Sequence, residues 1–383
     1  MRVLYVAPRY HTNQIPIMKG WIENGHEVMF VSQVTNASEN HDILKPVVLG
    51  YARLFRIFFH FSNVLKNRTL PDELFAFSSK RGFPPYIALR KIIKDFKPDV
   101  AILRERSLYT VVAYHICRTL RIPSILYNQS PYWEIPNKRK SKLKKIVAML
   151  FPRVRMTPVL GMPSEERLHE SGSYYVPFVM EPYCRTEEKE HFKDEKIQIL
   201  CVAGYHDRKR LPLLLDAVNC LKEEYPLHLS IVGEVITPDQ REYFSYIQKY
   251  VEELHLEKVV TLKKNYKREQ VFEEYVQADL FVLPSTRERA SISQLEAMSC
   301  GLPIICSDTN GAACQIEQGI NGYLFRDESL EDLIKKIELA VCDRERLVEM
   351  GQASYKLVKE NYSFRKYYQG VLQILSDMKK ENK

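Results

Sequence analysis

The sequence LFVLPSTRERASISQLEAMSCGLPIICSD, residues 280–308, contains the pattern that decides the fold. The apolar run 280–283 predicts a buried strand, and the polar residues after it predict a turn. Residues 292–298 have the apolar spacing of a helix, and Gly301 follows at a position where a left-handed cap favours glycine. The apolar run 302–306 predicts a second strand. This order of strand, loop, helix and strand is typical of a parallel α/β sheet.

Two glutamates lie in this unit, eight positions apart. Glu288 is expected at the carboxyl end of the first strand, and Glu296 about one turn inside the helix. Ligands of parallel sheets bind at that edge, where a helix N-terminus attracts phosphate. Carboxylates repel phosphate but accept hydrogen bonds from hydroxyls. A nucleotide-sugar, with phosphates in its middle and hydroxyl-bearing rings at both ends, fits both demands. The alternative is that both glutamates are exposed residues of an ordinary α/β turn.

The spacing Glu288–x7–Glu296 resembles the signature of retaining GT-B glycosyltransferases, specifically family four. Leu283-Pro284-Ser285 before it, and Gly301-Leu302-Pro303 and Asp308 after it, extend the resemblance. The resemblance implies that Glu288 contacts hydroxyls of the donor sugar and is catalytic, and that Glu296 holds the ribose. It also implies that the backbone amides between them face the diphosphate.

The chain departs from that signature at two places. The family usually has Gly-Phe-Gly after the first glutamate, whereas this chain has Arg289-Ala290-Ser291. Glycine lets a backbone approach phosphate closely, so Arg289 either offsets the loss with its charge or blocks the donor pocket. The second departure is Cys314, where the family has a glutamate.

Residues 197–203 predict the first strand of a second Rossmann-like domain, and a basic turn follows it. Lys209 aligns with the family's diphosphate-binding lysine, and Arg208 is the candidate for the arginine beside it. The resemblance implies that these cations stabilise the departing diphosphate without a metal ion. It also implies that Lys264 and Asn265 meet the nucleotide base. Considered without the resemblance, the basic turn is equally an exposed loop. Further on, Asn321-Gly322 predicts a type I′ turn.

The chain begins with a βαβ pattern: strand 2–7, helix 15–24 and strand 28–32. The turn after the first strand has no glycine, so a dinucleotide fingerprint is absent, which argues against an NAD or FAD enzyme. In GT-B proteins this turn lines the acceptor side. His11 and Asn13 are therefore candidate acceptor-binding residues, with helix capping as the alternative.

Gln129 follows the predicted strand 122–127, near a position where many family members have a histidine close to the anomeric carbon of the donor. An amide donates or accepts a hydrogen bond but cannot shuttle a proton. Gln129 is a candidate catalytic residue by position, and its replacement of the histidine in function stays open.

The net charge of +8 is unevenly distributed. Residues 1–185 hold 28 basic and 14 acidic residues, while the remainder holds 28 basic and 34 acidic. Two segments combine cations with apolar side chains, 51–68 and 137–155, and the second holds eight cations and no acid. Such segments suit an anionic membrane surface, although a buried helix and a solvated face are the alternatives. No nucleic-acid motif is evident, so we expect no nucleic-acid partner.

With 383 residues, two domains are expected. We predict a GT-B fold: two Rossmann-like doubly wound domains facing a central cleft. The expected parts are an acceptor and membrane-facing domain (1–180), a linker (181–195), a nucleotide-sugar-binding domain (196–360) and a C-terminal helix (361–383) that packs back on the first domain.

The implied function is transfer of a sugar, with retention, from an NDP-sugar to a hydroxyl of a glycan or lipid-linked cell-envelope precursor. No cofactor or metal ion is expected, and neither a signal-peptide pattern nor a membrane span is evident. We therefore expect a cytoplasmic hexosyltransferase at the inner face of the plasma membrane. The alternatives are a non-catalytic GT-B partner subunit and a GT-B nucleotide-sugar epimerase.

Overall fold

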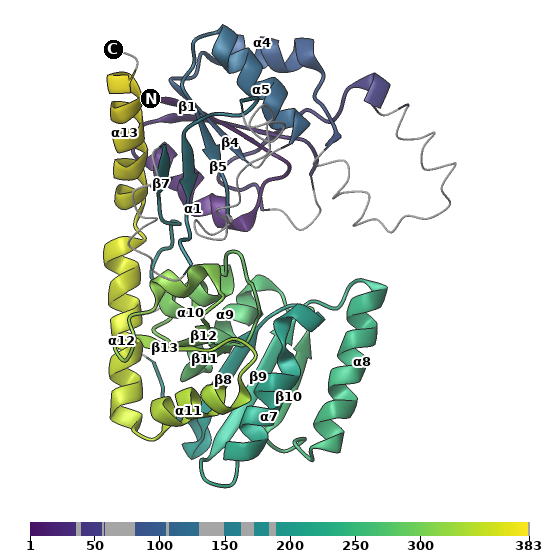
Figure 1. Cartoon of the computed structure of the whole chain (residues 1–383), viewed down its shortest axis with the longest axis vertical. Coiled ribbons are helices and arrows are strands. Elements are labelled where there is room, and N and C mark those ends of the chain that lie inside the picture. Colours follow the sequence, from purple (N-terminus) through teal and green to yellow (C-terminus); the bar gives the residue numbers. More distant parts are fainter. Residues whose placement is uncertain are drawn as a thin grey trace.

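The computed structural model describes residues 1–35, 40–55, 57, 81–104, 107–129, 149–161, 172–183 and 189–381. These residues form two α/β domains stacked along the long axis of the molecule (Figure 1). Each domain is built on one parallel sheet.

The N-terminal domain contains a seven-stranded sheet in the order β3-β2-β1-β4-β5-β6-β7. Its strands are β1 (Arg2–Ala7), β2 (Glu27–Ser32), β3 (Val47–Val48), β4 (Val100–Arg104), β5 (Ser124–Tyr127), β6 (Arg155–Thr157) and β7 (Ser173–Tyr175). Among its described residues, the helices are η1 (Thr12–Gln14), α1 (Ile15–Glu23), α4 (Tyr86–Phe96) and α5 (Leu108–Thr119).

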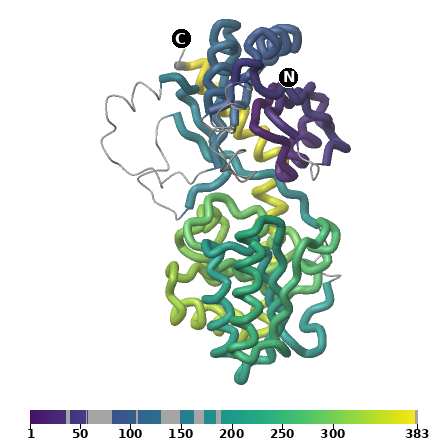
Figure 2. Tube along the Cα trace, turned by 90° about the vertical axis from the view of Figure 1, so that its right-hand side faces the viewer, coloured from purple at the N-terminus to yellow at the C-terminus, as the bar shows by residue number. Residues whose placement is uncertain are grey.

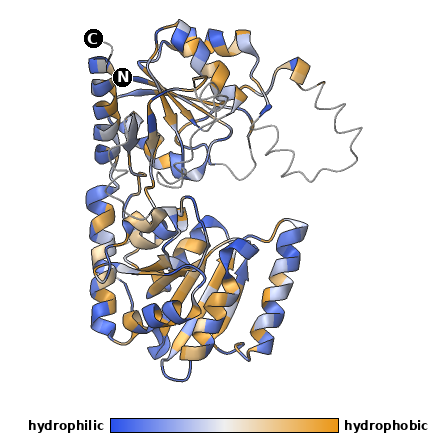
Figure 3. Ribbon diagram, viewed as in Figure 1, coloured by the Kyte–Doolittle hydropathy of each residue, from blue (hydrophilic) through white to orange (hydrophobic). Residues whose placement is uncertain are grey.

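Both faces of this sheet are buried, as parallel sheets require. Val3 and Tyr5 of β1 pack on one face, in the same core cluster as Trp21 of α1. Leu4 and Val6 point to the other face, where α4 and α5 cover them. Successive side chains of a strand alternate between faces, so β1 contributes to both cores. Figure 3 shows mostly hydrophobic residues in the strands and a mixture of hydrophobic and hydrophilic residues in the helices.

The C-terminal domain contains a six-stranded sheet in the order β10-β9-β8-β11-β12-β13. Its strands are β8 (Ile197–Val202), β9 (Leu227–Gly233), β10 (Val260–Lys264), β11 (Leu280–Leu283), β12 (Ile304–Ser307) and β13 (Gly322–Phe325). Its helices are η5 (Lys193–Glu195), η6 (Asp207–Lys209), α7 (Leu211–Leu221), α8 (Pro238–Glu253), α9 (Arg268–Gln277), α10 (Ile292–Ser299), η7 (Gly311–Gln315), α11 (Leu330–Val341) and α12 (Arg344–Asn361).

The last helix, α13 (Phe364–Glu381), follows α12 and runs back along the N-terminal domain (Figures 1 and 2). Its Tyr367 hydroxyl lies 2.9 Å from that of Tyr5, and Trp21 Nε1 donates to the Tyr5 hydroxyl at 2.8 Å. Gly20 of α1 lies directly beneath the Phe364 ring. The chain end therefore completes the core of the domain in which the chain began.

The type I′ turn predicted at Asn321-Gly322 is wrong. Gly322 begins β13, which pairs with β12 in parallel, whereas a type I′ turn joins antiparallel strands. A Cβ at Gly322 would lie 1.9 Å from the Ile304 carbonyl oxygen, so close strand approach explains the glycine.

The two cationic segments fall largely outside the described residues, which include only 51–55, 57 and 149–155 of them. In the described part of the chain, no helix is both long and apolar enough to span a membrane.

Candidate active site

The strand order reverses between β8 and β11 in the C-terminal sheet, and between β1 and β4 in the N-terminal sheet. Loops that leave the carboxyl ends of two such strands go to opposite faces and leave a crevice for ligands. The residues predicted to bind donor follow β8, β10 and β11, and His11 follows β1. The predicted site residues thus gather at the ligand-binding edges of both sheets.

The turns after β8 and β11 are joined by their backbones. The Thr286 amide donates to the Arg208 carbonyl at 3.0 Å. Arg210 closes the first turn in a left-handed conformation, with φ of 50°. These contacts place the 208–210 cations beside the loop that carries Glu288.

Arg208 and Lys209 converge on Glu288. Arg208 Nη1 donates to Glu288 Oε2 at 2.7 Å, and Lys209 Nζ donates to the same oxygen. The Glu288 side chain is 11% exposed. Burial raises the pKa of Glu288, but Lys209 and then Arg208 outweigh it and hold the pKa below its usual range. Glu288 is therefore an ionised carboxylate that forms ion pairs with two cations.

The backbone of Glu288 is held from the neighbouring loop after β12. The Gly311 amide donates to the Glu288 carbonyl at 2.7 Å. Asn310 is buried beside it and donates to Gln294 of α10 at 2.9 Å. Sequence reasoning missed Asn310 and Gln294 as supports, because their pairing depends on how the two loops meet.

The three residues that replace the family's Gly-Phe-Gly lie between Glu288 and α10. Arg289 is exposed and Ala290 is half-buried. Ser291 is buried and caps α10, since its hydroxyl accepts a hydrogen bond from the backbone N–H of Gln294 at 3.2 Å. The helix N-terminus here is therefore formed by a cap that needs no glycine.

Glu296 lies inside α10 and has a separate set of partners. Its carboxylate accepts from Arg268 Nη1 and from the Tyr275 hydroxyl, each at 3.3 Å. Burial raises the pKa of Glu296, and Arg268 and Tyr275 oppose that effect only in part. The environments of the two glutamates therefore shift their pKa values in opposite directions, downward for Glu288 and upward for Glu296.

Lys264 is the last residue of β10, and Asn265 follows it. Lys264 Nζ lies 4.9 Å from the centre of the Phe244 ring. Asn265 has a positive φ of 58°, and its Oδ1 accepts from the Val235 amide at 2.8 Å. This asparagine ties the loop after β10 to the loop after β9.

In the N-terminal domain, Gln129 is hydrogen-bonded to Arg104, the last residue of β4, and the charge of Arg104 acts on His11. Arg104 Nη2 donates to Gln129 Oε1 at 2.8 Å, and Arg9 Nε donates to His11 Nε2 at 3.2 Å. Burial, Arg104 and Arg9 lower the pKa of His11 to about 3, so the imidazole is neutral at physiological pH. Sequence reasoning missed Arg104, although a charged residue at the end of a buried strand was a usable signal.

Asn13 lies in η1 beside this group. Its Oδ1 is buried and accepts no hydrogen bond from the residues that the structure describes. The structure therefore brings His11, Gln129 and Arg104 together, with Asn13 two residues beyond His11.

The two domains meet through loops at their carboxyl edges. The Gly161 amide, after β6, donates to the Gly311 carbonyl, after β12, at 2.7 Å. Cys314, where the family has a glutamate, is half-buried beside Leu160 and Gly161, and desolvation raises the pKa of its thiol to about 11. In the described ranges, no cluster of three or more His, Cys, Asp and Glu side chains could hold a metal ion.

Comparisons with known proteins bear on the family and the fold of this chain. The sequence model of the family described as Glycosyl transferases group 1 matches residues 185–357. Sulfoquinovosyl transferase SQD2 of Arabidopsis thaliana is 23% identical over 365 residues, which covers 83% of this chain and 68% of the relative.

Two solved structures extend over nearly the whole chain. A glycosyltransferase from Rickettsia africae ESF-5 has a TM-score of 0.74 and 14% identity, and covers 98% of both chains. Anabaena HepE in complex with UDP has a TM-score of 0.73 and 12% identity, and covers 98% of this chain and 100% of its own. The predicted fold, with two Rossmann-like domains of the GT-B type, is confirmed.

Proposed function

We propose that this chain, a glycosyltransferase of the GT-B fold, moves a sugar from an NDP-sugar to an acceptor hydroxyl with retention at the anomeric carbon. The match over residues 185–357 and the named relatives confirm the prediction of a glycosyltransferase enzyme. The donor, the stereochemistry and the acceptor are the proposed parts.

One observation carries the proposal: two cations and a buried carboxylate converge at the switch point between β8 and β11. A donor diphosphate placed there would accept hydrogen bonds from Lys209 and Arg208. Glu288, released from those cations, would accept hydrogen bonds from the sugar hydroxyls. As the bond to the sugar breaks, charge develops on the leaving diphosphate, and cations held in advance stabilise that charge.

The remaining donor groups follow from the neighbouring loops. Glu296 lies one helical turn into α10, and its carboxylate oxygens suit the two ribose hydroxyls. Lys264 and Asn265, at the end of β10, are proposed to meet the base. UDP is bound by HepE, so a uridine nucleotide is the first donor to test.

The acceptor is proposed to bind on the N-terminal domain, near His11, Asn13 and Gln129. Because the His11 pKa is about 3, its neutral ring can hydrogen-bond to an acceptor but does not carry charge. Gln129 cannot take a proton, so we assign it to orientation of the substrates. The excess of basic residues in 1–185 supports an anionic partner, consistent with a lipid-linked cell-envelope precursor at the inner face of the plasma membrane.

A panel of UDP-, GDP- and ADP-sugars tests the donor by thermal shift, because a ligand that binds the native state raises the melting temperature. The selected donor is then incubated with candidate acceptors, and NMR of the product reports the anomeric configuration. Inversion would overturn the retaining mechanism. Persistent activity in chelator is expected if no metal ion takes part.

The same panel separates the alternatives. A non-catalytic partner subunit would bind none of the sugars, and an epimerase would convert its donor without any acceptor. A melting temperature raised by one nucleotide class, with turnover that depends on acceptor, supports the transferase.

A further inference from the structure

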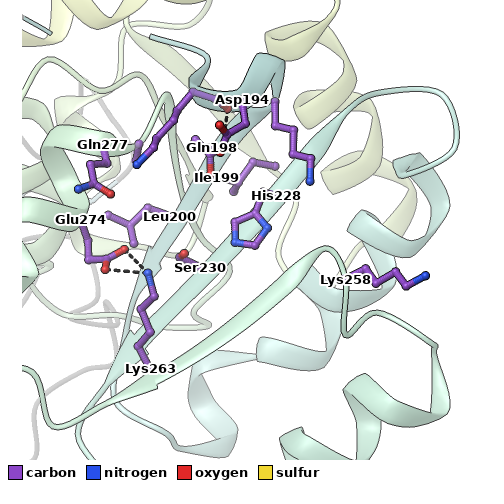
Figure 4. Close-up of a pocket in the computed structure, with 13 residues that line it drawn as sticks. Asp194, Gln198, Ile199, Leu200, His228, Ser230, Lys258, Lys263, Glu274 and Gln277 are labelled. Carbon is purple, nitrogen blue, oxygen red and sulfur yellow. Dashed lines mark hydrogen bonds and ion pairs between the residues drawn. The ribbon is translucent and has the colours of Figure 1, made fainter. Parts of the chain in front are cut away.

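The C-terminal sheet has a polar patch on one face. Gln198, His228, Ser230 and Lys263 share this face, because registered pairs of β8, β9 and β10 point the same way. Parallel sheets normally have apolar residues on both faces. Here the polar side chains line a cavity of about 300 Å³ between the sheet, α9 and the η5 segment (Figure 4).

The cavity has an excess of positive charge. Its lining includes four lysines and two acids. Lys263 Nζ is held by both carboxylate oxygens of Glu274 at 2.7 Å, as Figure 4 shows. Lys193 and Lys196 are exposed at the η5 side of the opening. A single ion pair therefore leaves the cavity with more cations than anions.

The surroundings of His228 are also positively charged. The ring lies 3.1 Å from the Thr261 hydroxyl through Nε2. Burial lowers its pKa, and Lys196 and Lys263 lower it further, against an opposing effect of Glu274. A neutral imidazole and the buried Ser230 hydroxyl thus lie beside the ammonium of Lys263.

We propose that this cavity binds a small anion of the phosphate class at a site separate from the donor site. A tetrahedral oxyanion offers acceptors in several directions, which suits hydroxyl, imidazole and ammonium donors on adjacent strands. The volume is sufficient for inorganic phosphate or a small phosphorylated metabolite. The proposal does not depend on the sugar that the enzyme transfers.

Calorimetric titration of inorganic phosphate into the full chain tests the site, with ionic strength held constant by chloride. The titration is repeated with Lys209→Ala, which weakens the competing anion site between β8 and β11. Saturable binding should persist in that variant. Loss of all phosphate binding in Lys209→Ala would overturn the proposal.

Variants of the lining sharpen the test. Lys196→Gln should weaken phosphate binding about two- to fivefold, as expected for one exposed charge. Ser230→Ala should weaken it about two- to tenfold, as expected for one hydrogen bond. Glu274→Gln should tighten it, because Lys263 loses its counter-charge. Lys335→Gln, an exposed lysine on α11, is the matched control and should leave binding unchanged.

NMR of the imidazole provides a second measurement. The His228 signal, identified by its loss in His228→Gln, should titrate at higher pH when phosphate is bound, because the anion offsets the lysines. A glucose-6-phosphate arm separates free phosphate from a phosphate monoester as the preferred form. An unchanged His228 titration at saturating phosphate, or equal weakening in Lys335→Gln, would contradict the site.

Discussion

Lys209 Nζ donates a hydrogen bond to Glu288 Oε2 across the switch point between β8 and β11. The two residues are 79 positions apart in the chain. Arg208 donates to the same oxygen. The two cations predicted to bind phosphate are therefore hydrogen-bonded to the carboxylate predicted to bind the sugar. The three side chains are thus already assembled where the donor phosphates and sugar are expected to meet.

Lys209→Ala should weaken binding of nucleoside diphosphate and intact donor. A charge-assisted hydrogen bond to phosphate contributes about 1.5–3 kcal/mol, so a loss of roughly tenfold or more is expected. Isothermal titration calorimetry measures it, with Lys335→Ala on α11 as the control. Wild-type affinity in Lys209→Ala would move the diphosphate role to Arg208 or Arg210.

Glu288 and Glu296 should fail differently when each is replaced by alanine. Glu296→Ala should weaken the binding of free nucleoside diphosphate and of intact donor alike, because both ligands carry the ribose. Glu288→Ala should bind diphosphate no more weakly than wild type, since Lys209 and Arg208 lose their carboxylate partner. Its turnover should fall about a hundredfold, the effect of a sugar misplaced by about 1 Å.

Calorimetry with both ligands, beside a transfer assay, separates these roles. Full activity in Glu288→Ala would show that this carboxylate does not orient the sugar. Indistinguishable diphosphate affinities in the two variants would return the Glu–x7–Glu spacing to an ordinary α/β turn.

Replacement of each glutamate by glutamine should change stability in opposite directions at pH 7. Burial raises the pKa of Glu288, but Lys209 and Arg208 hold it below 4.5, so its stabilising effect is present above pH 4.5 and is lost as pH falls through the folded-state pKa. The Glu296 pKa is above 4.5, chiefly through burial, so its stabilising effect is present below pH 4.5 and is lost as pH rises through that pKa.

At pH 7, Glu288→Gln should therefore lower the free energy of unfolding and Glu296→Gln should raise it. Both differences in the free energy of unfolding from wild type should shrink near pH 4, because there a larger fraction of each carboxyl is protonated in the unfolded chain. Denaturant unfolding at the two pH values measures this. Changes of the same sign at pH 7 would contradict the opposite environments described above.

Gly20→Ala should loosen the packing of α13 on the N-terminal domain. An added Cβ would lie 2.1 Å from the Phe364 ring, so the ring must move. We expect destabilisation of about 1–3 kcal/mol, the usual effect of overpacking, despite the better helix propensity of alanine. Phe364→Leu in the same chain should restore part of that loss. An additive double variant in denaturant unfolding would show that the two residues do not compete for space.

Charge reversal of Lys142, Lys144 and Lys145 to Glu should release the protein from anionic vesicles. These lysines lie outside the described residues, and each basic residue near a headgroup surface contributes about 1 kcal/mol. Liposome pelleting measures binding, which should weaken with salt and be absent for neutral vesicles. Diphosphate affinity serves as the control for folding. Pelleting that ignores lipid charge would refute the membrane prediction.

Local patterns alone located the elements around the two glutamates. The run 280–283 and the spacing 292–298 became β11 and α10 with nearly the predicted bounds. Gly301 has the expected positive φ of 68°. These features depend on residues a few positions apart, whose side chains alternate across a strand or recur on one helix face. The sequence could therefore predict them without knowledge of any distant contact.

Tertiary structure decided which side chains meet. Arg208 and Lys209 reach Glu288 because β8 and β11 are neighbours, although about 80 residues separate them. The type I′ turn prediction was wrong because Gly322 is required by the close approach of Ile304 on a parallel strand. The residues next to Asn321-Gly322 in the sequence do not indicate that contact. Arg104 binds Gln129 and acts on His11 through its charge because β1, β4 and β5 are neighbours in the sheet. Local sequence determines backbone periodicity, whereas the partner of a charged side chain depends on strand order, which is set by packing of the whole domain.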